Sequence, residues 1–362
     1  MKLHLLFIGN KFLYNIPLKE YIIRKIEQNC DFISNVTYFK ESDNSLFLYL
    51  EELLNSTTKL IIITTKQNFS TIGKLISTVT SDNQIVKDNM LIPSKCSIFQ
   101  DKSYLLEYKD AITNVICMDE MQEMPELLLS SQNSNAAIHI FEETKDNTYA
   151  LLNPIAQTYD IHIDIVEIIS GWMRIDIRSK KYGDISKFIK SAKYLLPKKL
   201  ILASNIAAYI IEKLSNEQKK ITFAESCSGG LLSYYFTSQN GASKILDGSL
   251  VTYSNSLKEN WLAVEHSTLE KEGAVSYGVV KEMSEGALNV SEADYSISIS
   301  GIAGDSGGTD EKPVGTVYVG VRSKTIHKEE HLKLQGDRNY VQHQSILFAV
   351  KMLLLLDKEM FF

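Results

Sequence analysis

Uninterrupted apolar runs recur in the first third of the chain. Three of them predict strands buried on both faces of a sheet: Leu3–Gly9, Lys59–Thr65 and Ala111–Met118. Apolar residues at helical spacing follow the first run over Leu18–Ile26 and the second from about Thr71. This alternation of strand and helix predicts a parallel sheet covered by helices.

The middle of the chain has a different period. Apolar and polar residues alternate in three segments, which predicts strands with one face in water: Ala136–Glu143, Asp160–Ile168 and Gly171–Ser179. A helix is predicted over Asp184–Leu196 and ends before Pro197. The polar run Ser130–Asn135 is interpreted as a linker in front of this small α+β unit.

The last part again mixes helices and strands. The predicted elements are a helix over Leu200–Leu214, strands over Ile221–Ala224, Ser249–Thr252 and Ala293–Gly304, a strand pair PVGTVYVGVRS and HKEEHLKL, and a final helix capped by Asp337. The chain is therefore predicted to hold three domains, residues 1–133, 134–197 and 198–362, in the α/β class.

Composition narrows the functional classes. The 362 residues are 44% hydrophobic and 23% charged, which is typical of a globular protein with two or three domains. A net charge of -6 argues against nucleic-acid binding but leaves a small anionic ligand possible. The start resembles a buried strand more than a signal peptide, and the apolar run Leu353–Leu356 is too short to span a membrane. We therefore expect a cytoplasmic protein without a membrane partner.

Cysteine and histidine give no sign of a metal centre. The four cysteines are far apart and are interpreted as free thiols: Cys30, Cys96, Cys117 and Cys227. The histidines of the last part are His266, His327, His331 and His343. His327 and His331 are expected on one exposed strand face, so no metal is predicted.

The most informative segment is ITFAESCSGGLLSYYF. A strand runs into Ser226, and Gly229 and Gly230 precede a helix. A serine at such a turn can expose its hydroxyl at a sheet edge, while nearby amides bind a phosphate or an oxyanion. On spacing alone, a glycine-rich turn that only reverses the chain is an equal alternative.

A possible base follows the next strand. Tyr253 and Asn255 precede Lys258, and no histidine is close in the sequence. A buried lysine can be neutral and accept a serine proton, although a solvated helix lysine is the commoner case. The loop after Ser300 contains Gly301, Gly304, Gly307, Gly308 and Gly315. Its backbone donors could bind a phosphate or ribose, or the loop could be a mobile hairpin connection.

Five motifs then carry a family resemblance. They are AESCSGG, GSLVTYSNSLK, GAVS (Gly273–Ser276), SISGIAGDSGGTDEKPVGTVYVG and GDR (Gly336–Arg338). In this order and spacing, from about Leu200 to Leu356, they resemble the C-terminal domain of the CinA family. That domain is similar to amidases that hydrolyse the carboxamide of nicotinamide mononucleotide to nicotinic acid mononucleotide and ammonia. The resemblance implies no cofactor for the amidase domain, a nucleotide as small-molecule substrate, and a homodimer.

The resemblance also assigns residues. It implies Ser226 as nucleophile, Lys258 as general base and Tyr253 as a supporting residue that orients the lysine or the serine. The residues expected around the substrate are Glu225, Ser228, Gly229, Gly230, Asn255, Gly301, Gly304, Gly308 and Arg338. Amides near Ser228–Gly230 would hold the oxyanion, and the 5′-phosphate would rest on the Gly304–Gly308 loop or near Arg338. Ser228 and Asp305 depart from the threonine and proline usual in the family.

The front of the chain resembles the full-length CinA architecture more faintly. That architecture places a molybdopterin-binding-like domain first and a small KH-like α+β domain second. Here KQNFSTIGK follows the second strand, without the paired glycines with which the family's first domain wraps a pyrophosphate. We therefore expect a degenerate domain without ADP-ribose pyrophosphatase activity, and a middle domain that lacks the GXXG loop needed for RNA. Two alternatives stay open: a non-catalytic nucleotide-binding regulatory protein, and a bifunctional enzyme that also hydrolyses ADP-ribose.

Overall fold

The computed structural model describes the chain except residues 1, 31–32, 57, 130–134, 292 and 305. It divides into two compact units, Met1–Asn133 and Ser134–Phe362. Asp305 and the expected linker, apart from Asn135, lie outside the described residues. The expected domain boundary near Pro197 lies inside the second unit and stays a prediction.

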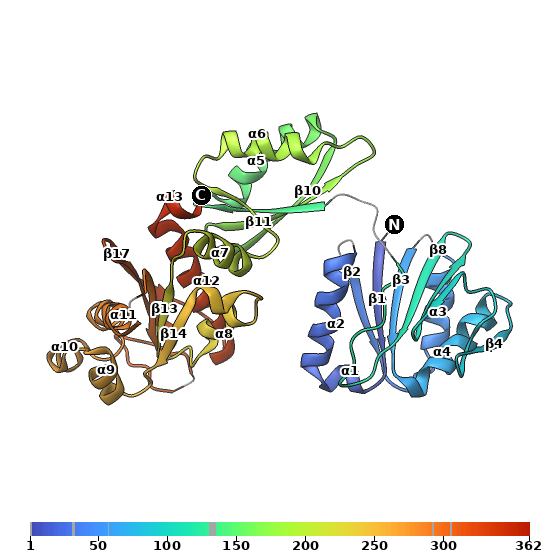
Figure 1. The fold of residues 1–362 in the computed structure, drawn as a ribbon, viewed down its shortest axis with the longest axis horizontal. Helices are drawn as coiled ribbons and strands as arrows, with labels where there is room; N and C mark the ends of the chain where they lie inside the picture. Colours follow the sequence, from blue (N-terminus) through green and yellow to red (C-terminus); the bar gives the residue numbers. More distant parts are fainter. Residues whose placement is uncertain (1, 31–32, 57, 130–134, 292, 305) are drawn as a thin grey trace. The chain divides into compact units, whose positions relative to one another are not determined.

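The first unit is a doubly wound sheet (Figure 1). Its elements are β1 (Lys2–Ile8), α1 (Lys11–Tyr14), α2 (Ile16–Asn29), β2 (Ile33–Phe39), α3 (Leu46–Leu54), β3 (Thr58–Thr64), α4 (Lys66–Val79), β4 (Gln84–Lys87), β5 (Met90–Pro93), β6 (Ile98–Gln100), β7 (Ser103–Tyr108) and β8 (Ala111–Cys117). The strand order is β2-β1-β3-β8-β7-β6, in which the first four strands are parallel and the last two antiparallel.

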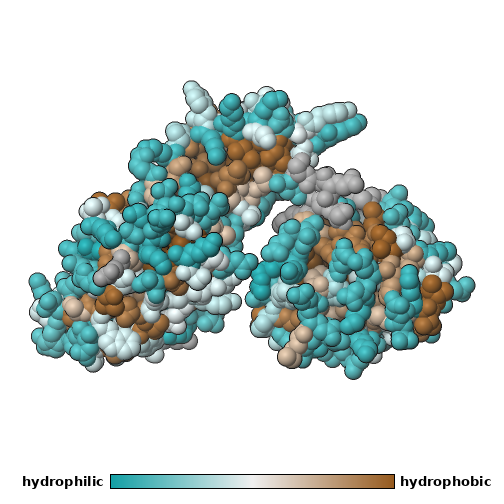
Figure 2. Space-filling model, in the orientation of Figure 1, coloured by the Kyte–Doolittle hydropathy of each residue, from teal (hydrophilic) through white to brown (hydrophobic). Residues whose placement is uncertain are grey.

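Both faces of this sheet are buried, as the unbroken apolar runs predict. Leu5 and Phe7 of β1 pack with α1 and α2, whereas Leu6 and Ile8 pack with α3 and α4. The β4–β5 hairpin leaves Ile85, Val86 and Leu91 exposed, at the apolar surface near the tip of this unit (Figure 2).

The helix α4 begins at Lys66, five residues before the expected start near Thr71.

The second unit contains two sheets. Its elements are β9 (Asn135–Phe141), α5 (Lys145–Thr158), β10 (Ile161–Ile169), β11 (Trp172–Ser179), α6 (Ile185–Leu195), β12 (Leu200–Leu202), α7 (Ile206–Asn216), β13 (Ile221–Glu225), α8 (Leu231–Thr237), η1 (Ala242–Lys244), β14 (Leu246–Val251), α9 (Asn255–Leu262), α10 (His266–Glu272), α11 (Tyr277–Ser291), β15 (Tyr295–Gly301), β16 (Thr316–Ser323), β17 (His327–Lys333), α12 (Arg338–Leu356) and α13 (Lys358–Phe361). The sheet orders are β10-β11-β9-β12 and β14-β13-β15-β16-β17.

The predicted helix over Leu200–Leu214 is wrong at its start. Leu200–Leu202 form β12, which pairs antiparallel with β9, and α7 begins only at Ile206. Asn205 ends the extended segment because its side chain caps the helix by accepting from the amide of Ala208 (3.0 Å). The four-stranded sheet therefore takes its last strand from the segment assigned to the third domain.

The five-stranded sheet positions the site. β13 lies between β14 and β15 and is parallel to both, whereas β16 and β17 are antiparallel additions. The isoleucines of β15 face the core shared with α12, and its serines are buried against α11. Ser296 and Ser298 donate to carbonyls of α11 at 2.7 and 2.6 Å, which satisfies hydroxyls that the alternating pattern alone would place in water.

Candidate active site

Ser226 and Lys258 meet at the carboxyl edge of the five-stranded sheet. Ser226 directly follows β13, and Lys258 lies on α9, which follows the neighbouring strand β14. The Nζ atom of Lys258 is 3.1 Å from the Oγ atom of Ser226. The two residues are 32 positions apart in the sequence and meet because two neighbouring parallel strands end side by side, where ligands of open α/β sheets bind.

Lys258 is not the solvated helix lysine that its sequence context favours. Its side chain is 1% exposed and also donates to the carbonyls of Thr252 (2.8 Å) and Tyr253 (3.2 Å). Among the residues that the structure describes, no carboxylate pairs with it, and burial lowers the pKa of its ammonium group. The neutral form of the Lys258 amine is therefore more favourable in this buried site than it would be in bulk water.

The three neighbours of Nζ suit a neutral amine. A neutral amine has two N–H donors and one lone pair, and the two carbonyls can take both donors. The lone pair is then free to accept the proton of the Ser226 hydroxyl. The neighbouring Cys227 is a poor competitor as nucleophile because burial raises the pKa of its thiol to about 12.

The glycines after Ser226 make a tight strand-to-helix turn. Gly229 and Gly230 have φ values of 61° and 98°, a region that residues with a side chain adopt only with strain. The turn brings the first residues of α8 back over the carboxyl end of β13. The predicted local geometry of strand, serine turn and helix is thus confirmed.

Glu225 organises this turn, which corrects its expected role in substrate binding. It is fully buried, and both its oxygens accept hydrogen bonds from within the protein. The donors are the hydroxyls of Ser228 (2.8 Å), Ser233 (2.6 Å) and Ser249 (3.3 Å) and the amides of Gly230 (3.0 Å), Leu232 (3.0 Å) and Ser233 (2.9 Å). This set holds the carboxylate at the start of α8 and leaves it engaged.

The same contacts exclude the amides of Gly229 and Gly230 from the expected oxyanion donors. The amide of Gly230 donates to Glu225, and the amide of Gly229 donates to the carbonyl of Ser226 (3.1 Å). The Ser228 hydroxyl is also engaged with Glu225. These groups hold the turn together and are not available to a substrate.

Tyr253 contacts Lys258 through its backbone and not through its ring. Its phenol oxygen accepts from Nη2 of Arg338 at 2.8 Å, while its carbonyl accepts from Lys258. The contact of Tyr253 with Lys258 is thus made by its carbonyl, whereas its phenol contacts Arg338. The ring instead forms an exposed pair with Arg338, the first residue of α12.

The structure brings the glycine-rich loop to Arg338. A Cβ atom on Gly304 would lie 2.8 Å from Nη1 of Arg338, so the glycine permits this close approach. Gly301 ends β15, Gly308 lies in the loop that follows, and Asn255 is exposed at the start of α9. The loop and Arg338, which were expected as alternative binding sites for a phosphate, thus lie side by side.

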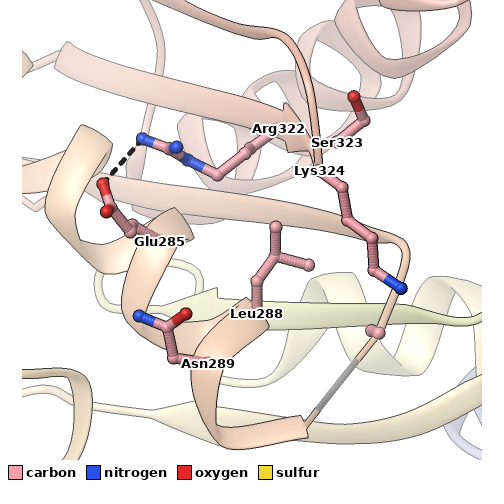
Figure 3. Close-up of a pocket in the computed structure, with 7 residues that line it drawn as sticks. Glu285, Leu288, Asn289, Arg322, Ser323 and Lys324 are labelled. Atoms are coloured by element: carbon pink, nitrogen blue, oxygen red, sulfur yellow. Dashed lines mark hydrogen bonds and ion pairs between the residues drawn. The ribbon is translucent and has the colours of Figure 1, made fainter.

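A separate cavity of about 610 Å³ lies at the opposite edge of the sheet. It is lined by Glu285, Leu288, Asn289, Ala293, Arg322, Ser323 and Lys324 (Figure 3). Arg322 pairs with Glu285 at 3.0 Å, and Lys324 pairs with Asp294 at 3.2 Å. Both cations of this cavity are thus already paired with carboxylates.

The described residues were searched for metal-binding groups and for membrane-spanning helices. Within them, no group of three or more histidine, cysteine or carboxylate side chains could hold a metal ion. No helix among them has the length and apolar character needed to cross a bilayer. His331 is not an exposed partner of His327, because it is half-buried and stacks on Tyr318 with ring centroids 4.6 Å apart.

Comparisons with known proteins show which family the chain resembles. The CinA C-terminal domain model matches residues 203–356. A CinA-like protein of Petrotoga mobilis is 32% identical over 285 residues, which cover 70% of this chain and 69% of that protein. The chain belongs to the CinA family. The matched residues include Ser226, Tyr253, Lys258 and Arg338.

Two other CinA relatives define how much of the chain is shared. A competence-damage inducible protein of Thermoanaerobacter sp. (strain X514) is 34% identical over 231 residues, which cover 64% of this chain and 51% of that protein. The chain thus spans about half the length of that relative. The crystal structure of the competence/damage inducible protein CihA from Agrobacterium tumefaciens has 33% identity, covering 42% of this chain and 93% of that chain with a TM-score of 0.41.

Proposed function

We propose that this CinA protein is a serine–lysine amidase that hydrolyses the carboxamide of nicotinamide mononucleotide, giving nicotinic acid mononucleotide and ammonia. The observation that carries the proposal is the 3.1 Å contact between the buried Lys258 amine and the Ser226 hydroxyl. The family resemblance supplies the substrate, and the exposed Arg338 beside the glycine-rich loop offers a cation for its phosphate.

The proposed chemistry proceeds in two steps. Lys258 takes the proton of Ser226 as Oγ forms a bond to the carboxamide carbon, and the π electrons of the carbonyl move to its oxygen. When the carbonyl forms again, the C–N bond breaks and Lys258 returns the proton to the leaving nitrogen, which departs as ammonia. Water then attacks the acyl-enzyme with Lys258 as base, which releases the acid product and restores Ser226. No cofactor enters the proposed reaction.

Replacing the nucleophile tests this function. Ser226→Ala should reduce ammonia release from nicotinamide mononucleotide to background, a loss of at least about a thousandfold, because no covalent intermediate can form. The unfolding midpoint should stay close to that of the unmodified protein, since only one oxygen is removed. Ser256→Ala on the exposed start of α9 is a matched control that should keep full activity. Near-normal turnover by Ser226→Ala would disprove the assignment.

A further inference from the structure

Two backbone N–H groups beside Ser226 have no acceptor on another residue. In the turn after β13, the amides of Gly229 and Gly230 are engaged, as are the hydroxyls around Glu225. The amides of Cys227 and Ser228 donate to no other residue in the described part of the chain. Both residues are buried, at 5% and 3% exposure, where a donor without a good acceptor is unfavourable, and the Cys227 amide has only its own thiol sulfur as a weak acceptor. Such donors are expected to have a ligand as their partner.

Each of these two amides is oriented through its own peptide group. A trans peptide group is planar, and its N–H and C=O bonds point in opposite directions. The carbonyl of Ser226, which shares a peptide group with the amide of Cys227, accepts from Gly229 within the turn (3.1 Å). The carbonyl of Cys227, which shares a peptide group with the amide of Ser228, accepts from Nε2 of Gln342 at 2.6 Å.

Gln342 reaches the turn from a distant part of the sequence. It lies on the second turn of α12, 115 residues after Cys227, and its side chain is partly buried. The helix is anchored at its start, where Asp337 caps it by accepting from the amide of Tyr340 at 2.8 Å. The side-chain amide of Gln342 therefore holds the Cys227–Ser228 peptide from a fixed element.

We propose that the N–H groups of Cys227 and Ser228 form the oxyanion hole, and that Gln342 is the positioning residue that aims the Ser228 amide. The proposal rests on the proposed function. As Ser226 bonds to the carbonyl carbon, charge develops on the carbonyl oxygen, and two pre-oriented amides stabilise that charge more than the neutral ground state. Gln342 does not touch the substrate, so its loss should affect the transition state and leave substrate binding nearly unchanged.

The test uses two variants of the full chain that lack the donor. Gln342→Leu removes it with little change in volume, and Gln342→Glu keeps the shape but places a carboxylate oxygen against the Cys227 carbonyl. Both should lower kcat at least about tenfold, less than the loss of a whole donor, which is about a hundredfold or more. KM and the affinity for nicotinic acid mononucleotide should change less than twofold. Gln344→Leu is the matched control, because among the described residues that side chain donates only to the Gln335 carbonyl (3.5 Å), away from Cys227, and it should behave as the unmodified protein.

A second readout separates this inference from the choice of substrate. A fluorophosphonate probe bonds its phosphorus to the Ser226 oxygen and releases fluoride, with the serine proton passing to Lys258. The phosphoryl oxygen needs the same two amides, so the labelling rate should fall about tenfold in Gln342→Leu, stay unchanged in Gln344→Leu and vanish in Ser226→Ala. Labelling that follows this order in a protein without amidase activity would support the oxyanion hole and disprove the proposed substrate.

Three results would overturn the inference. The first is a Gln342→Leu protein that keeps both rates within twofold. The second is a loss of kcat accompanied by an equal change in KM and a lower unfolding midpoint, which would make Gln342 a packing residue only. The third is an unmodified protein that neither releases ammonia nor reacts with the probe, which would also overturn the proposed function.

Discussion

At the scale of single residues, the proposed chemistry depends on Lys258 losing its proton. Lys258→Arg should be nearly as damaging as Lys258→Ala, each lowering kcat by at least about a hundredfold, because a guanidinium group does not deprotonate in proteins. If Lys258 served only as a fixed positive charge for the substrate, arginine would keep much of the rate. Steady-state ammonia release from the two variants distinguishes these cases.

The pH dependence of the unmodified protein gives an independent check of the same role. Burial lowers the pKa of Lys258 from its ordinary value of 10.5, so its neutral fraction grows as pH rises through the lowered value. Activity should therefore rise with pH along a limb whose midpoint lies below 10.5, and residual activity of Lys258→Ala should lack that limb. A rate that falls with increasing pH over this range would contradict a neutral lysine base.

Glu225 should matter for stability as well as for the site. In Glu225→Gln an NH₂ group replaces one acceptor oxygen, and it must face donors such as the amides of Leu232 or Ser233. Since each unsatisfied buried donor costs about 1–3 kcal/mol, the free energy of unfolding should fall by about 3 kcal/mol in denaturant titration. The exposed Glu285, which pairs with Arg322, provides the control, because Glu285→Gln should change stability by less than about 1 kcal/mol. Equal effects of the two substitutions would contradict the role of Glu225.

The residues of the site differ in how far the sequence predicts them. Ser226 could be predicted from the strand, serine and glycine pattern, because that signal is local. Lys258 was assigned by resemblance, since no local signal shows that a helix lysine is buried. The sequence does not single out Gln342, because its proposed role rests on a hydrogen bond to Cys227, which is 115 residues away in the chain. The contact of the Tyr253 phenol with Arg338, 85 residues away, could not be obtained from spacing either.

At the scale of elements, strands with strong patterns were predicted well. Those of the parallel core, such as β1 and β3, are marked by unbroken apolar runs because both faces are buried. The three-residue strand β12 was missed because it is too short to show a period, and its leucines fit a helix equally well. Tertiary pairing with β9 decides its conformation.

This pairing predicts how the second unit responds to truncation. The four-stranded sheet shares a core with α7 and α12, in which Phe141 and Trp172 are 0% and 2% exposed. A fragment of residues 198–362 would lose these aromatic contacts, each worth about 1.5–3 kcal/mol, together with the partner of β12. Its unfolding midpoint should lie about 10 °C below that of a fragment of residues 134–362.

Activity and stability should separate in these two fragments. Ser226, Lys258 and Gln342 are retained in both, so ammonia release per folded molecule at low temperature should be similar. Thermal unfolding followed by circular dichroism, with sedimentation to exclude aggregates, measures the difference. Equal midpoints for the two fragments would show that the four-stranded sheet does not stabilise the catalytic part.

At the scale of the whole molecule, the second unit holds all the groups of the proposed active site, whereas the first unit lacks the glycines expected of a pyrophosphate-binding turn. The five-stranded sheet of the second unit gathers the proposed nucleophile, base and phosphate-binding cation at one edge. In the first unit, α4 begins with Lys66, Gln67 and Asn68 directly after β3. Side chains thus occupy the turn where the faint resemblance to the family's first domain would place paired glycines, which bring backbone amides close to a pyrophosphate.

We therefore expect the full chain to release ammonia from nicotinamide mononucleotide but to leave ADP-ribose intact. Incubation with each nucleotide, with and without a divalent cation, and chromatography of the products measures both reactions. The fragment of residues 134–362 serves as the control, because it should match the full chain on nicotinamide mononucleotide if the first unit adds no catalytic group. Cation-dependent formation of AMP and ribose 5-phosphate by the full chain, absent from the fragment, would show that the first unit binds pyrophosphate without the glycines. In that case the side chains at the start of α4 would have to supply the phosphate contacts, and Lys66→Ala should abolish AMP formation while ammonia release continues.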